Sequence, residues 1–145
     1  MSDFYLQPGL AQPAPSELDL PYWNGLKENV LNVQRCGACQ GWQWGPEWIC
    51  HHCLSTDVGF EAVSATGVIY SYERVWHPVH PALAEQGPYL VVLVELPHAG
   101  DIRMIGNLLG DAQQPVTIGA AVEGVFEHHP EAQPTYTLLH WRIAE

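Results

Sequence analysis

The sequence predicts a mainly β protein, with an N-terminal helix, a rubredoxin-like zinc ribbon and a C-terminal five-stranded barrel of the OB-fold class. Two observations lead to this prediction. All four cysteines lie between residues 35 and 54 in the pattern C-x2-C-x10-C-x2-C, and five apolar or alternating segments follow residue 60. Turn signals separate these segments and no long helix interrupts them, which is typical of a small closed barrel.

We expect the chain to have four parts. The first contains Pro8, Pro13 and Pro15 with few apolar residues, which predicts an extended arm that is ordered only where something holds it. The expected order is an extended arm over residues 1–17, a helix and lead-in strand over 18–34, the zinc ribbon over 35–58 and the OB-fold domain over 59–145.

Residues 18–29 are predicted to form one short amphipathic helix. Pro21 suits a first helical turn, Asp19 can cap it, and Tyr22, Trp23 and Leu26 share a face. Residues 30–34 then alternate in polarity, which predicts a strand that leads into the ribbon.

The four cysteines, Cys36, Cys39, Cys50 and Cys53, are the predicted ligands of one structural metal ion. Each Cys-x-x-Cys pair can wrap a tight turn that points two sulfurs at one ion, and four thiolates fill the tetrahedral shell of zinc with no open position. Two disulfides, a redox-active pair and bound iron are the alternatives, and spacing alone does not separate zinc from iron. His51 and His52 lie inside the second pair and are expected to point away from an ion that is already saturated.

Three tryptophans, Trp42, Trp44 and Trp48, lie between the two cysteine pairs. A ribbon of about 20 residues buries little core of its own, so we expect these side chains to cover the metal or to pack on a neighbour. Stacking on nucleic-acid bases is a weaker interpretation, because Lys and Arg do not accompany the rings.

The barrel is predicted from five strands. The first is interrupted by Gly67, as a long strand with a bulge would be, and residues 89–96 form a nearly continuous apolar run that is typical of a buried central strand. Residues 97–100 form a short hairpin connection. The expected strands cover residues 62–75, 89–96, 101–109, 122–128 and 135–143.

Two connections carry histidines and occupy the positions of the binding loops of an OB-fold. Residues 76–88, between the first two strands, contain Trp76, His77 and His80. Residues 127–134, between the last two, contain His128 and His129. Metal binding or proton transfer by these histidines is one hypothesis; solvated loop residues are the commoner case.

Composition excludes several classes of protein. The 145 residues are 47% hydrophobic and 14% charged, which indicates a globular chain. Five Lys plus Arg against sixteen Asp plus Glu give a net charge of −11, which opposes generic binding to nucleic acid. Residues 1–10 lack the features of a signal peptide and no apolar run approaches the roughly 20 residues of a membrane span, so we expect a cytoplasmic protein.

Several stretches together resemble a known family. YWNGLKENVLNVQRC, the paired cysteines, GPYLVVLVEL and VTIGAAVEGVFE look like the acyl-CoA-associated proteins that combine a zinc ribbon with an OB-fold, a family long catalogued as a domain of unknown function. The resemblance covers about residues 18–127.

The resemblance implies an accessory subunit that is not catalytic by itself and that supports a thiolase-like enzyme or an acyl-CoA hydratase. The partner would supply carbon–carbon cleavage or acyl transfer on steroid side-chain or polyketide thioesters, and would hold most of the acyl-CoA. Arg74 and Arg103 are the candidates for CoA phosphate contact. The candidates for contact with partner or acyl chain are Trp23, Trp44, Trp76, His77, His80 and Tyr89.

Two other functions remain open from the sequence. One is a module that binds single-stranded nucleic acid, since ribbons and OB-folds both do so. The other is an independent acyl-CoA enzyme in which Glu73, Glu85 or Glu95 pairs with a loop histidine. The sequence contains neither a Gly-x-Ser-x-Gly elbow nor a phosphate-binding loop.

Overall fold

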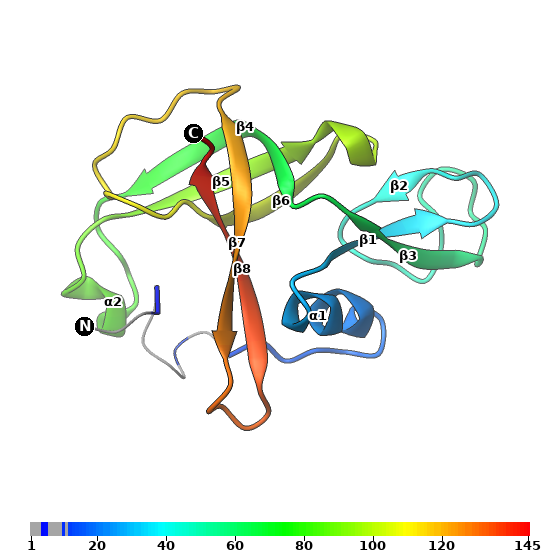
Figure 1. Cartoon of the computed structure of the whole chain (residues 1–145), viewed down its shortest axis with the longest axis horizontal. Coiled ribbons are helices and arrows are strands. Elements are labelled where there is room, and N and C mark those ends of the chain that lie inside the picture. Colours follow the sequence, from blue (N-terminus) through cyan, green and yellow to red (C-terminus); the bar gives the residue numbers. More distant parts are fainter. Residues whose placement is uncertain (1–3, 6–9, 11) are drawn as a thin grey trace.

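The computed structural model describes residues 4, 5, 10 and 12–145, and Figure 1 shows their arrangement. Residues 1–3, 6–9 and 11 of the predicted arm therefore lie outside the described residues. The elements are α1 (Leu20–Lys27), β1 (Leu31–Cys36), β2 (Trp42–Gln43), β3 (Val58–Val63), β4 (Thr66–Val75), α2 (Pro81–Ala84), β5 (Tyr89–Leu96), the 3-10 helix η1 (Pro97–Ala99), β6 (Ile102–Asn107), β7 (Ala121–His129) and β8 (Tyr136–Ile143).

The C-terminal part is a nearly closed, five-stranded antiparallel barrel, which confirms the predicted fold class. Its strand order is β6-β5-β4-β7-β8. The two outer strands approach each other through a parallel bridge between Leu108 and Trp141, and the N–H of Leu109 donates to the carbonyl of Trp141 at 2.7 Å. This contact between β6 and β8 almost completes the barrel.

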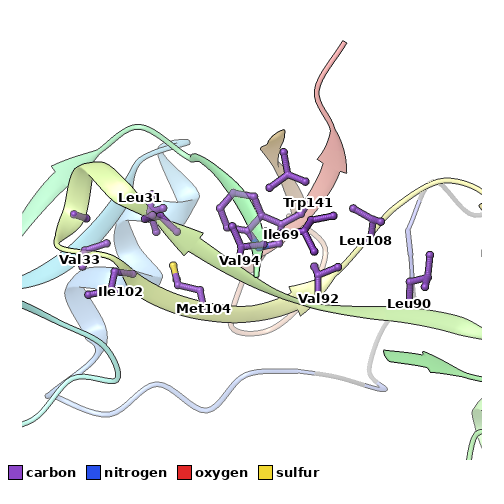
Figure 2. Packing of buried hydrophobic residues seen from close by; sticks show 13 residues of the cluster. Leu31, Val33, Ile69, Leu90, Val92, Val94, Ile102, Met104, Leu108 and Trp141 are labelled. Carbon is purple, nitrogen blue, oxygen red and sulfur yellow. The ribbon is translucent and has the colours of Figure 1, made fainter. Parts of the chain in front are cut away.

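The core of the barrel is organised by the alternation along β5. Every second residue of this strand is buried, and Figure 2 shows Leu90, Val92 and Val94 on the same side of the strand as the indole of Trp141. Trp141 is fully buried, and a Cβ at Gly106 would lie only 2.8 Å from its ring. A glycine is therefore required on β6 where the indole packs.

The first predicted barrel strand begins too early. Residues 62 and 63 end β3, which pairs with β1 in the ribbon sheet, and residues 66–75 form β4 of the barrel, which contains a bulge. The bulge lies between Ile69 and Ser71 and not at Gly67. Gly67 has another role, because a Cβ there would lie 2.5 Å from the carbonyl oxygen of Glu95 on the neighbouring strand.

Helix α1 lies between the ribbon and the long β7–β8 hairpin (Figure 1). Leu26 is fully buried, as the predicted apolar face requires. Asp19 occupies the N-cap position but caps no helical N–H, which corrects the expected role of its side chain. Its carboxylate instead accepts from the N–H of Ser16 at 2.6 Å and from the indole N–H of Trp23 at 3.1 Å.

Among the described residues, no helix is both long enough and apolar enough to cross a membrane.

Candidate metal centre

The ribbon brings the four cysteine sulfurs to one point. Cys36 Sγ lies 3.6 Å from Cys53 Sγ, Cys39 Sγ lies 3.6 Å from Cys50 Sγ, and all four sulfurs lie within 4.8 Å of one another. A tetrahedral zinc ion with Zn–S bonds of about 2.3 Å requires sulfurs about 3.8 Å apart. The four thiols therefore fit one tetrahedral ion, and these separations are far from the roughly 2.05 Å of a disulfide.

The two cysteine pairs are built in the same way. In the first, the N–H of Gln40 donates to the carbonyl of Cys36, and Gln40 has a φ of 63°. In the second, the N–H of Leu54 donates to the carbonyl of Cys50, and Leu54 has a φ of 64°. Each chain reversal directs two sulfurs inward and turns backbone N–H groups toward the first of them.

Those N–H groups act on the thiols directly. The N–H of Ala38 lies 3.3 Å from Cys36 Sγ, and that of His52 lies 3.3 Å from Cys50 Sγ. The N–H groups of Cys53 and His52 lower the pKa of Cys50 to about 6. The N–H of Ser55 lowers the pKa of Cys53, but desolvation and the three other sulfurs outweigh it and raise this pKa to about 12. Four thiolates at one point thus need a cation, which is the usual coupling of deprotonation to metal binding.

The histidines inside the second pair do not join the sulfur cluster. His52 Nε2 lies 3.0 Å from the carbonyl oxygen of Trp42, and His51 is exposed. In the described part of the chain, the group of side chains placed to hold a metal consists of the four cysteines alone.

The ribbon tryptophans are divided between the interior and the surface. The guanidinium of Arg35 lies 4.5 Å from the ring of Trp42, and Trp44 meets Tyr22 of α1 edge-on at 4.8 Å. Both rings also pack against the buried core cluster, and a Cβ at Gly100, beside the barrel strand β6, would lie 3.0 Å from Trp42. Packing within the chain therefore accounts for both side chains. Trp48 remains exposed.

The other side chains predicted to contact the partner or the acyl chain differ in their exposure to solvent. Trp76 is 53% exposed, while His80 Nδ1 accepts the N–H of Ala82 at 3.2 Å and so caps the short helix α2. His77 is exposed and Tyr89 is half-buried. Trp23 is half-buried on α1.

Both candidate arginines already have partners. The guanidinium of Arg74 donates to the backbone carbonyls of Ala112, at 2.9 Å, and of Gln114. Arg103 donates to Glu95 at 2.9 Å and lies 3.6 Å from the ring of Tyr70. Either arginine would have to give up these contacts to meet a phosphate.

A cavity of about 360 Å³ opens beside the β4–β5 connection. Its walls carry the hydroxyl-bearing rings of Tyr5 and Tyr89 and the amides of Gln86 and Asn107 among apolar side chains, and none of its lining residues is acidic or basic. Burial raises the pKa of Tyr5 to about 12, so this phenol is neutral at physiological pH. The cavity suits an uncharged group.

The structure also contains a buried polar cluster that sequence reasoning missed. His128 and His129 belong to β7 and not to a loop, which corrects their predicted placement. His129 Nε2 lies 2.7 Å from Glu127, His140 Nε2 lies 3.2 Å from the other oxygen of that carboxylate, and the N–H of Tyr5 donates to the same oxygen at 2.7 Å. The Glu127 and His129 spacing of two residues was the available signal, since it places both on one strand face.

His129 and His140 are both buried in this cluster. The ring of His129 lies between Phe4 and Tyr136, with both centroid distances 4.3 Å. Burial lowers the pKa of His140, and the nearby Glu127 only partly opposes this. Glu73, Glu85 and Glu95, the predicted partners of a histidine, have no part in it.

Comparison with known proteins identifies relatives of both domains. The model of the ChsH2 rubredoxin-like zinc ribbon domain matches residues 23–59, and that of the ChsH2 C-terminal OB-fold domain matches residues 60–127. Together with the four converging sulfurs, the first match confirms the predicted zinc cofactor.

Solved structures also resemble the chain. A structure described as the Ltp2-ChsH2(DUF35) aldolase is 35% identical, with a TM-score of 0.77, and the match covers 92% of this chain and 100% of that one. A DUF35 protein of unknown function from Sulfolobus solfataricus is 17% identical with a TM-score of 0.60 over 89% of this chain and 87% of its own, which shows the fold alone.

A probable enoyl-CoA hydratase alpha subunit from Thermomonospora curvata is 36% identical over 140 residues. The match covers 95% of this chain but only 42% of that relative, so the chain spans less than half of the relative's length.

Proposed function

The chain belongs to the ChsH2 family of zinc-ribbon and OB-fold proteins, and we propose that it is the non-catalytic accessory subunit of an acyl-CoA-processing complex. Its partner would be a thiolase-like enzyme that performs carbon–carbon cleavage, such as a retro-aldol reaction, or acyl transfer. The observation that carries this proposal is the 35% identity, over the whole of that chain, to the ChsH2 component named with the Ltp2 aldolase.

The chemistry of the described residues supports an accessory role. All four cysteines converge on the metal site, so none is left as a nucleophile, and a four-thiolate site keeps no open position for catalysis. In the buried cluster, the carboxylate of Glu127 lies 2.7 Å from His129 and 3.2 Å from His140. Catalysis is accordingly assigned to the partner.

The neutral cavity beside Tyr89 supports contact with the acyl end of a thioester. Apolar walls with a few hydroxyl and amide groups suit an acyl chain, whereas CoA phosphates need cations or helix N-termini. Arg74 and Arg103 are held by their own partners, and the chain has a net charge of −11. The nucleotide end of CoA would therefore rest mainly on the partner.

A hydratase is the second candidate partner, because the Thermomonospora curvata relative carries that name. The same accessory role applies, and the partner's reaction differs: addition of water to an unsaturated acyl-CoA in place of carbon–carbon cleavage.

Co-expression tests the proposal and separates the two partners. The chain would be produced with a thiolase-like protein or with a hydratase-like protein from the same source, and each pair would be purified through a tag on the partner. We expect stoichiometric recovery of one pair and a partner activity that falls when the chain is omitted. Turnover of an acyl-CoA by the chain alone, or full activity of both partners without it, would refute the accessory role.

A further inference from the structure

Among the described residues, the barrel has an outer face whose side chains are exposed or partly exposed. Strand register defines it: Ser71, Leu93 and Ile105 lie side by side across β4, β5 and β6, and Glu95 pairs with Arg103 one row away. Buried and less buried residues alternate along β5 and β6, with Val94 and Met104 turned to the core and Leu93 and Ile105 turned outward. We call this surface the outer sheet face; it comprises Tyr70, Ser71, Glu73, Val91, Leu93, Glu95, Arg103 and Ile105.

The outer sheet face exposes large apolar side chains. Ile105 is 75% exposed and Tyr70 is 45% exposed. The adjoining β4–β5 connection also carries exposed apolar side chains, Trp76 and Val79, of which Val79 is 99% exposed. Exposed apolar side chains that share one face of a sheet indicate a candidate contact site.

The outer sheet face has a small net charge, although the whole chain carries −11. Arg103 and Glu95 neutralise each other at 2.9 Å, and the same guanidinium covers the ring of Tyr70. Glu73 is the remaining acid of the face and is exposed. An apolar centre with an aromatic ring, a paired arginine and few other charges is the composition that distinguishes the centre of a protein–protein interface.

We propose that the outer sheet face is the surface by which this chain docks on its partner enzyme, against an apolar patch that presents a Lys or Arg to Glu73. The inference rests on the proposed function, since the occupant is the catalytic subunit assigned there. Docking on this face would also place the mouth of the neutral cavity, at Tyr89 on β5, beside the interface.

Charge favours the partner enzyme on this face over two other occupants, a second copy of the chain and single-stranded nucleic acid. Two copies of a chain with a charge of −11 repel each other, and the face offers Glu73 no cation on a second copy, because Arg103 is already paired. Single-stranded nucleic acid could stack on Tyr70 and Trp76, but its phosphates would meet no unpaired cation of this face.

The test measures the dissociation constant between the partner purified from the co-expressed pair and four forms of the chain: wild type, Ile105→Lys, Glu73→Lys and Leu20→Lys. Leu20 is the matched control, because it is an exposed aliphatic residue on α1, away from β6. We expect Ile105→Lys to weaken binding at least about tenfold, because it would bury an unpaired ammonium at the centre of the contact. Glu73→Lys should weaken binding several-fold and reverse its salt dependence, and Leu20→Lys should bind within about twofold of wild type.

Zinc content and thermal midpoint serve as folding controls. Ile105→Lys and Glu73→Lys are both expected to fold. Both residues are exposed, Ile105 lies on β6 at the edge of the strand order, and Lys is well tolerated on edge strands. Wild-type affinity in Ile105→Lys, or loss of binding confined to Leu20→Lys, would overturn the docking face while leaving the accessory role intact. Failure of the wild-type chain to bind either candidate partner would refute the proposed function, and with it this inference. A wild-type dimer that Ile105→Lys dissociates would instead assign the face to a second copy.

Discussion

Removal of one zinc ligand should destabilise the whole protein and not only the ribbon. In Cys36→Ser the metal loses a thiolate at the last residue of β1, where the sulfur lies 3.6 Å from that of Cys53. A serine hydroxyl is a poor substitute for a thiolate on zinc, and at structural zinc sites the binding free energy is folding free energy. We therefore expect zinc to be released and the ribbon to unfold.

The magnitude follows from the position of β1. Leu31 and Val33 of this strand are fully buried in the same hydrophobic cluster as Val94 and Trp141 of the barrel. If β1 detaches, two apolar side chains leave the core at about 1.5–3 kcal/mol each, which gives a loss of about 3–6 kcal/mol. That is a large part of the roughly 5–15 kcal/mol that holds a typical domain folded.

The assay combines zinc content with thermal unfolding followed by circular dichroism. Ala38→Ser is the matched control, because residue 38 lies in the same cysteine turn, is exposed and offers no sulfur. The control should keep one zinc per chain and the wild-type midpoint, while Cys36→Ser should lose the metal and unfold many degrees lower. One bound zinc in Cys36→Ser with a midpoint within about 2 °C of wild type would refute the reasoning.

Three further predictions concern the barrel and its surface. Gly67→Ala should lower the free energy of unfolding by about 1–3 kcal/mol in urea titrations, because its Cβ would lie 2.5 Å from the carbonyl oxygen of Glu95; an unchanged midpoint would contradict this. Burial lowers the pKa of His140 in the folded protein, so below about pH 6.5 this residue binds a proton more readily in the unfolded chain. Acidification should therefore reduce the free energy of unfolding. His140→Gln should flatten the dependence of that free energy on pH in this range. An identical slope in both proteins would exclude His140 as the cause. Trp76→Ala should weaken partner binding while the thermal midpoint changes little, since the ring is 53% exposed; pull-downs that match wild type would remove Trp76 from the interface.

Local sequence signals predict the metal site and most of the barrel. The four cysteines needed no knowledge of distant contacts, because each pair makes its own turn and the two turns are 10 residues apart. The strand β5 was similarly clear, since its apolar run is bounded by turns and buried on alternate residues. Features that depend on neighbours a few residues away are the ones that a single sequence specifies best.

The division of residues 62–75 between two sheets could not be predicted in this way. The segment is uniformly β-forming, and what separates β3 from β4 is the choice of partner: β3 pairs with β1, and β4 pairs with β5 and β7. Gly67 looked like the break in the strand, but its absent Cβ serves the close approach of β5. A glycine in a strand can indicate a break or a close approach of another segment, and the sequence does not show which segment approaches.

The buried Glu127 cluster shows the same limit at longer range. A carboxylate and two imidazoles on one hairpin would normally face water, and burying them is costly unless their polar atoms are paired. The N–H of Tyr5, 122 residues away in the chain, supplies one of those hydrogen bonds, and Phe4 covers His129. The hairpin therefore depends on the N-terminal segment for its pairing and its cover. Asn29, in the turn that follows α1, contacts the hairpin at another point, because its Oδ1 lies 2.8 Å from His128 Nε2. The β7–β8 hairpin is therefore held in two places by residues that precede the ribbon.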